Sequence, residues 1–262
     1  MVEKEINVKR SDNKYKYKSR TLVNIDLYLK NGIHIGTKYK NGPMRRFIFK
    51  SRNDKLNVMD VQAIDQRIKI GIDFLLRYDP KDVIFISRKK YGLPGLKVLE
   101  KTFGYKSIVN RFIPGTFTNP QREGFTEPKL VFICDPNIDR QAIVEATKIC
   151  VPVMALATTS SNIRNIDLVL PFNNKGRKAI SLFFWLLNRE LQLRNGIIKS
   201  EQEYSYSVED FLFKVDKKDS KGKGNFNRDS RSSGRFGNSR FGRTNNYRSN
   251  TSTNTNPRPK NL

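Results

Sequence analysis

The stretch from Pro171 to Arg194, PFNNKGRKAISLFFWLLNRELQLR, decides how the rest of the chain has to fold. Its centre, LFFWLL, is apolar on every side of a helix, so we expect a helix buried against a sheet or a neighbouring protein. Lys175, Arg177 and Lys178 fall in the predicted first turn. The helix dipole disfavours cations there, whereas free backbone N–H groups attract anions. The pattern predicts a phosphate-binding helix start, and the alternative is an ordinary solvated turn.

Upstream of this helix, apolar segments alternate with helical ones. Asp139 is the expected N-cap of the helix over 139–150, and another helix is predicted over 92–103. Continuously apolar strands that alternate with helices indicate a parallel sheet covered on both faces. We therefore predict an α/β fold, a three-layer doubly wound sandwich with a mainly parallel sheet, over residues 21–197. The predicted strands are VIFIS (83–87), LVFICD (130–135), VPVMALAT (151–158) and IDLVLP (166–171).

The first part of the chain and its ends have other patterns. Thr21 is expected to cap a short helix, and a longer amphipathic helix is predicted over 61–78. Between them, FIFKSR and KLNVMDV, separated by Asn-Asp, predict a small hairpin. The remaining segments are predicted to be a basic N-terminal arm (1–20), a C-terminal extension (198–216) and a disordered basic tail rich in Arg, Gly, Asn and Ser (217–262).

The net charge of +25, from 50 Lys and Arg against 25 Asp and Glu, limits the classes of partner. Such an excess attracts a polyanion, so nucleic acid is the first candidate and an anionic membrane surface the second. No apolar run reaches the roughly 18 residues needed to span a bilayer, and residues 1–20 lack the apolar segment of a secretory signal. We expect a cytoplasmic protein in which Cys134 and Cys150 are reduced and packed as small core hydrophobes.

Basic residues gather in the loops between the predicted elements. Loops after parallel strands share one edge of a sheet, so the groups around Arg88, Arg164 and Lys175 are expected to converge. Such contacts bind phosphates and carry little sequence information. In the tail, aromatic rings interleaved with arginines suit stacking on bases, although a solubilising role is the alternative. The predicted RNA-binding residues are Lys38, Lys40, Arg45, Arg46, Arg88, Lys89, Lys90, Arg111, Arg164, Lys175, Arg177, Lys178, Arg235, Arg240 and Arg243.

Doubly wound folds often carry an active site, but this sequence has few catalytic motifs. There is no GxGxxG after a strand and no P-loop, and His34 is the single histidine, which favours a structural hydrogen bond over catalysis. Asp135 and the hydroxyls of 158–161 follow predicted strands, but one carboxylate and some hydroxyls do not make a mechanism. We expect no enzyme, no cofactor and no metal. The alternatives are an RNA-modifying or nucleotide-binding enzyme with its cofactor near Asp135 and Thr158, and a membrane-surface or adhesion role for the tail.

Several longer segments carry a resemblance to a known family. They are GIHIGT (32–37), RYDP (77–80), VIFISR (83–88), RFIPGTFTN (111–119), DPNIDRQA (135–142), VPVMALATTSS (151–161) and LPFNNKGRKAISLFFWLLNREL (170–191). In their order and spacing, residues 22–197 resemble the small-subunit ribosomal protein two family, in the archaeal and eukaryotic branch whose relatives include the laminin-receptor precursor. The long helical hairpin of the bacterial branch has no counterpart in this sequence.

The resemblance implies a non-catalytic α/β sandwich on the solvent side of the small ribosomal subunit, between head and body. It implies small-subunit rRNA and neighbouring ribosomal proteins as partners, with mRNA near its exit as a further one and no membrane partner. Three positions depart from the family pattern. Asn137 replaces a usual basic residue, and Thr158 and Ser160 stand where acidic residues are usual, which puts family contacts through those positions in doubt.

Overall fold

The structure, a computed structural model, describes residues 21–200 and 203–214. These residues belong to one compact unit. The predicted basic arm (1–20) and basic tail (217–262) lie outside the described residues, and so do the tail's predicted RNA contacts Arg235, Arg240 and Arg243.

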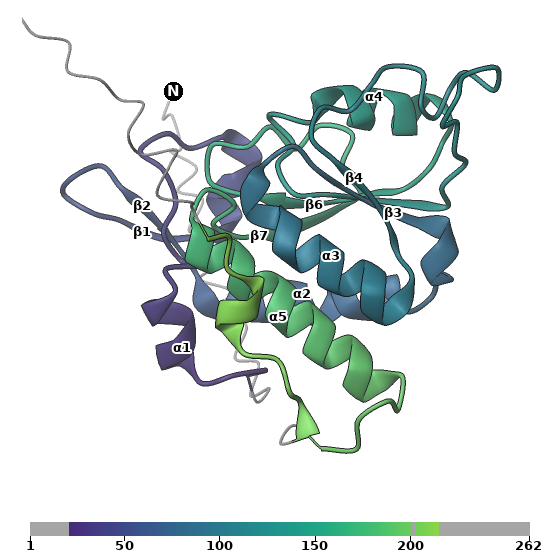
Figure 1. The fold of residues 1–262 in the computed structure, drawn as a ribbon. Coiled ribbons are helices and arrows are strands. Elements are labelled where there is room, and N and C mark those ends of the chain that lie inside the picture. Colours follow the sequence, from purple (N-terminus) through teal and green to yellow (C-terminus); the bar gives the residue numbers. More distant parts are fainter. Residues whose placement is uncertain (1–20, 201–202, 215–262) are drawn as a thin grey trace, which may run out of the picture. The chain divides into compact units, whose positions relative to one another are not determined.

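A five-stranded parallel sheet forms the centre of the described domain (Figure 1). Its strands are β3 (Val83–Ser87), β4 (Lys106–Val109), β5 (Leu130–Ile133), β6 (Val153–Ala157) and β7 (Leu168–Pro171). They lie in the order β4-β3-β5-β6-β7, and every neighbouring pair is parallel. The first strand of this sheet, β3, is thus an inner strand. The next strand, β4, lies on one side of it, and β5, β6 and β7 follow on the other side. This order confirms the predicted doubly wound α/β class.

Sequence analysis missed strand β4. Its sequence, KSIV, has only two apolar residues, and the strand lies at the edge of the sheet with no residue fully buried. The continuous apolar run that predicts a buried strand is therefore absent, because an edge strand is covered less completely.

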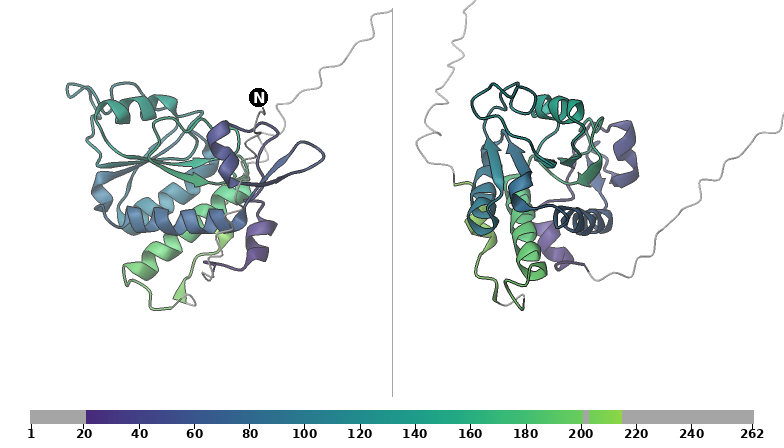
Figure 2. Two further views of the ribbon diagram at one scale, coloured as in Figure 1. Left: turned by 180° about the vertical axis from the view of Figure 1, so that it is seen from behind. Right: turned by 90° about the vertical axis from the view of Figure 1, so that its right-hand side faces the viewer.

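Helices and a long loop cover the two faces of the sheet (Figures 1 and 2). The helices are α1 (Ile25–Lys30), α2 (Val61–Leu75), α3 (Leu93–Phe103), α4 (Arg140–Lys148) and α5 (Arg177–Arg194). Buried residues of α2, α3 and α5 pack with Phe85 and Phe132 on one face. On the other face, α4 and the loop 110–129 cover Ile86 and Ile133. Alternate strand residues thus enter two separate cores, as a three-layer sandwich requires.

The helix with the apolar centre, α5, lies between the sheet and the C-terminal extension. Phe183 stacks on Phe132 of β5, with ring centroids 5.6 Å apart. From the opposite side, residues 203–214 cover the helix, and Trp185 Nε1 donates a hydrogen bond of 2.8 Å to the backbone oxygen of Tyr206. Trp185 is half-buried, whereas the apolar residues on either side of it are buried. Within residues 21–200 and 203–214, no helix is long and apolar enough to cross a membrane.

A small antiparallel hairpin precedes the sheet, as predicted, and consists of β1 (Ile48–Ser51) and β2 (Asn57–Met59). Two predicted boundaries are wrong. The N-cap of α1 is Asn24 and not Thr21, since the Asn24 side chain accepts a hydrogen bond from the backbone N–H of Asp26. Helix α2 ends at Leu75 rather than at Tyr78.

Helices α3 and α5 pack closely at Gly95. A Cβ atom at this position would lie 2.3 Å from Cγ and 2.5 Å from Cβ of Phe184. Real Cβ atoms do not come this close, so only a residue without a side chain fits at this crossing.

We expect Gly95→Ala to lower the free energy of unfolding by about 1–3 kcal/mol, because the added methyl group overpacks the crossing and outweighs the gain in helix propensity. Chemical denaturation of the full chain measures this. Gly42→Ala is the matched control, since a Cβ there would have no neighbour within 4 Å, and it should change stability by less than about 0.5 kcal/mol. Equal effects of the two substitutions would contradict the packing argument.

Candidate nucleic-acid interface

The loops that follow the parallel strands meet at one edge of the sheet, which we call the carboxyl edge. It consists of residues 88–91, 110–111, 134–139, 158–164 and 172–178. Ligands bind at this edge in doubly wound folds. Its exposed cations are Arg88, Lys90, Arg111, Arg164, Lys175, Arg177 and Lys178. None of them forms an ion pair with another described residue, so their charges face outward.

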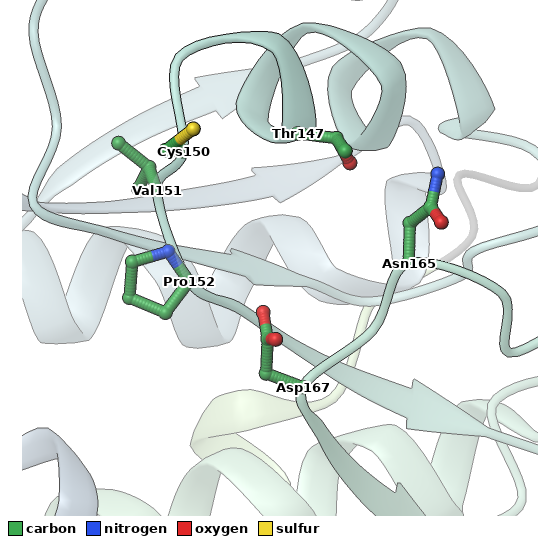
Figure 3. A pocket seen from close by; sticks show the side chains of 6 residues that line it. All are labelled: Thr147, Cys150, Val151, Pro152, Asn165 and Asp167. Atoms are coloured by element: carbon green, nitrogen blue, oxygen red, sulfur yellow. The ribbon is translucent and has the colours of Figure 1, made fainter.

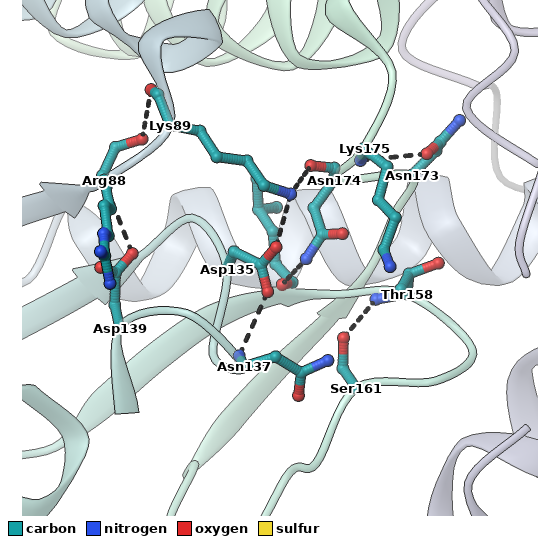
Figure 4. Close-up of polar contacts among 12 residues, drawn as sticks. Arg88, Lys89, Asp135, Asn137, Asp139, Thr158, Ser161, Asn173, Asn174 and Lys175 are labelled. Carbon is teal, nitrogen blue, oxygen red and sulfur yellow. Dashed lines mark hydrogen bonds and ion pairs between the residues drawn. The ribbon is translucent and has the colours of Figure 1, made fainter. Parts of the chain in front are cut away.

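Lys89 differs from these neighbours because its ammonium group is held inside the edge (Figure 4). Its Nζ lies 2.5 Å from Oδ2 of Asp135, which follows β5, and donates a 2.9 Å hydrogen bond to the backbone oxygen of Asn174, which follows β7. The Asp135 side chain is 4% exposed and that of Lys89 19%. One side chain thus ties together the loops after three strands, and we leave Lys89 out of the proposed phosphate contacts.

The acidic residues of the carboxyl edge are also turned inward. Asp135 Oδ1 accepts a hydrogen bond from the backbone N–H of Asn137, 3.1 Å away. Asp139 occupies the predicted N-cap position of α4 without capping it, and its carboxylate instead accepts a 3.4 Å hydrogen bond from the backbone N–H of Arg88. Burial raises the pKa of Asp139 to about 6. The edge therefore presents positive charge to solvent while both carboxylates are buried.

A second group of cations is brought to the end of β6 by the segment 35–41. The backbone N–H of Thr37 donates to Thr159 Oγ1 (2.8 Å), and that of Asn41 donates to the backbone oxygen of Thr159 (2.8 Å). The short 3₁₀ helix η1 (Gly42–Phe47) follows directly. The exposed cations of this group are Lys38, Lys40, Arg45 and Arg46. The structure thus places this group beside the edge that carries the predicted groups around Arg88, Arg164 and Lys175.

The described residues offer little to catalysis. Burial raises the pKa of Cys134 to about 12, so its thiol stays protonated as a core residue. Burial lowers the pKa of His34, and its Nδ1 has no hydrogen-bond partner among the described residues, so the expected structural hydrogen bond of this ring is not seen there. No group of three or more His, Cys, Asp or Glu side chains in the described part of the chain could hold a metal ion.

A hollow of about 370 Å³ lies near the start of β6, away from the carboxyl edge (Figure 3). Its lining residues are Thr147, Cys150, Val151, Pro152, Asn165 and Asp167. Cys150 is exposed, so the expectation that it packs in the core is wrong. The reason is local: Cys150 takes a left-handed conformation (φ 58°) where the chain turns from α4 towards β6.

Fold and site together define a class of protein: a doubly wound α/β domain whose carboxyl edge carries exposed cations. Sequence reasoning located the cations but missed the Lys89–Asp135 pair. The signal for it was a lysine two residues after β3 and an aspartate two residues after β5, the neighbouring strand. Both positions lie at the carboxyl edge, where opposite charges on adjacent strands come within reach.

Comparisons with known proteins give this class a family. Residues 122–192 match the family described as Ribosomal protein S2. Small ribosomal subunit protein uS2 of Methanococcus maripaludis strain C6 is 41% identical over 194 residues, which cover 74% of this chain and 87% of the relative. The strain C5 protein of the same name is 42% identical over 185 residues, with 71% and 84% covered.

The chain therefore belongs to the small ribosomal subunit protein uS2 family. This confirms the predicted family, with archaeal relatives over most of the chain. It is a family of structural ribosomal proteins, so the expectation that the chain is not an enzyme is confirmed as well.

Lys89→Met should lower the free energy of unfolding by about 3–5 kcal/mol, because it leaves the buried Asp135 carboxylate without its counter-charge. Denaturation of the full chain measures the loss. Lys90→Met is the matched control at an exposed neighbour, with an expected change below about 0.5 kcal/mol. The double variant Lys89→Met with Asp135→Leu should regain most of the loss. A single variant as stable as the parent would show that the pair does not tie the loops together.

Two adjacent threonines give a second test. Thr158 Oγ1 is buried and has no hydrogen-bond partner among the described residues, whereas Thr159 Oγ1 pairs with Thr37 and Tyr39. Thr158→Val should leave stability unchanged or raise it by about 1 kcal/mol, and Thr159→Val should lower it by about 1–3 kcal/mol. Thermal or chemical denaturation of both variants checks this. The opposite ranking would contradict the hydrogen bonds at the end of β6.

Proposed function

We propose that this chain is assembled into the small ribosomal subunit as a structural protein and that the carboxyl edge holds rRNA by its phosphates. The observation that carries the proposal is the distribution of charge at this edge, with cations exposed and carboxylates buried. Exposed Lys and Arg side chains without ion-pair partners among the described residues face outward, while Asp135 and Asp139 are buried. A phosphate backbone is the partner that such a surface recognises without reading sequence.

The start of α5 is the centre of this surface. The N-cap Gly176 offers no side-chain acceptor to the first turn, and Arg177 and Lys178 are exposed there. The helix dipole disfavours cations at this place, so they add no helix stability of their own. An anion binding at the helix start would compensate both charges, because the backbone N–H groups and the side chains then act on the same ligand.

The position on the subunit is a further part of the proposal. From the family resemblance we infer a site between head and body near the mRNA exit, with neighbouring small-subunit proteins and mRNA as contacts. The basic arm and the basic tail, with Arg235, Arg240 and Arg243, are proposed to extend the RNA contacts. What supports this part is the family and the net charge of +25.

Reversing Arg177 and Lys178 to Glu should weaken association with the subunit, because two phosphate contacts become repulsive. Sedimentation of cell lysate on a sucrose gradient, followed by washes of rising salt, measures the fraction that travels with the small subunit. The variant should be released at lower salt than the parent. Lys97→Glu with Lys101→Glu, the same charge change on exposed positions of α3, is the matched control. Equal retention of both variants would count against the α5 surface.

A further inference from the structure

Two aromatic rings stand out from the surface beside the hairpin. Tyr39 is 81% exposed and Phe49 is 74% exposed, more than any other large apolar side chain among the described residues. Phe49 lies on β1, and the hairpin projects from the body of the domain in both Figure 1 and the left view of Figure 2. Rings this exposed gain nothing from folding, so the surface that carries them is a candidate binding site.

The backbone beneath both rings is held in place. The pairing of β1 with β2 shifts between Ile48 and Lys50, so Phe49 is the extra residue of a bulge, a feature that re-aims a side chain. The backbone oxygen of Tyr39 accepts hydrogen bonds from Thr37 Oγ1 (2.8 Å) and Thr159 Oγ1 (3.1 Å). Both rings are thus presented from fixed backbone, which lowers the entropy lost when a ligand packs on them.

The surroundings of Phe49 are hollowed and cationic. A hollow of about 390 Å³ is lined by Lys40, Arg45, Ile48, Phe49, Lys50 and Ser51. Residues 38–58 contain seven Lys or Arg residues and one carboxylate, Asp54, which lies 4.0 Å from Arg52 in the hairpin turn. The hollow itself is therefore lined by positive charge and an aromatic ring, with no acidic residue among its lining side chains.

We propose that this hairpin surface binds unpaired RNA nucleotides. Phe49 and Tyr39 stack on bases, and Lys40, Arg45 and Lys50 hold the flanking phosphates. The proposal rests on the proposed function and adds the class of RNA that this surface takes. An aromatic face beside cations suits unpaired RNA, because each nucleotide offers a base for stacking and a phosphate for an ion pair. Duplex RNA keeps its bases stacked inside, so the two rings have no partner there.

The test uses the full chain, an unstructured RNA strand of about 12 nucleotides, and a duplex of the same length. Fluorescence anisotropy at several salt concentrations measures affinity. Phe49→Leu, which keeps an apolar side chain but loses the ring, should weaken single-strand binding about tenfold. The slope of affinity against salt should not change, because no phosphate contact is lost. Phe49→Tyr should bind like the parent, and Ile197→Ala is the control at an exposed apolar residue outside the hairpin.

Four outcomes decide between the alternatives. A tenfold loss confined to the single strand supports base stacking at Phe49. Unchanged binding by Phe49→Leu, with weaker binding by Arg177→Glu/Lys178→Glu, overturns the stacking proposal and leaves the proposed function standing. If polyglutamate competes as well as the RNA strand does, the hairpin surface binds acidic polypeptide and the proposal is wrong. If neither Phe49→Leu nor Arg177→Glu/Lys178→Glu weakens RNA binding, both proposals are contradicted.

Discussion

The ion pair between Lys89 and Asp135 is the constraint on which the carboxyl edge depends. It joins the loops after β3 and β5, the point at which the strand order reverses and where doubly wound folds bind their ligands. Taking two charges out of water costs free energy that the pair recovers only with good geometry. The second contact of Lys89, to the backbone oxygen of Asn174, supplies part of that free energy. The effect of the ion pair is to hold three loops in one arrangement.

This arrangement places the carboxylates of the edge inside and its cations outside. The side chains that would neutralise the surface, Asp135 and Asp139, are used for the internal contacts of the loops, and the cations are left outside. A rigid row of exposed cations suits a phosphate backbone, which offers charge at regular intervals. The hairpin differs, because it adds exposed aromatic rings to its cations. The two surfaces therefore suit two features of RNA, the phosphates and the bases.

Much of the fold could be predicted because local pattern and burial agree. The four apolar strands, the hairpin and the buried helix α5 all appear where their patterns indicated. The failures have two physical reasons. Strand β4 is only partly covered because it lies at the edge of the sheet, which depends on strand order and not on its own sequence. Cys150 is exposed because it lies in a left-handed turn between α4 and β6.

The sequence by itself determined the class of sheet, its layers and the loops that carry the cations, since each follows from periodicity and from the rule that parallel strands end at one edge. Only the tertiary structure decided which charges face solvent. Lys89 and Lys90 are neighbours with the same side chain, yet one is held by Asp135, 46 residues away, and the other is exposed. The same holds for Phe49, which lies at the bulge against β2 and is exposed. Pairings between distant residues leave no local pattern, because a side chain's partner is set by the fold and not by its neighbours in sequence.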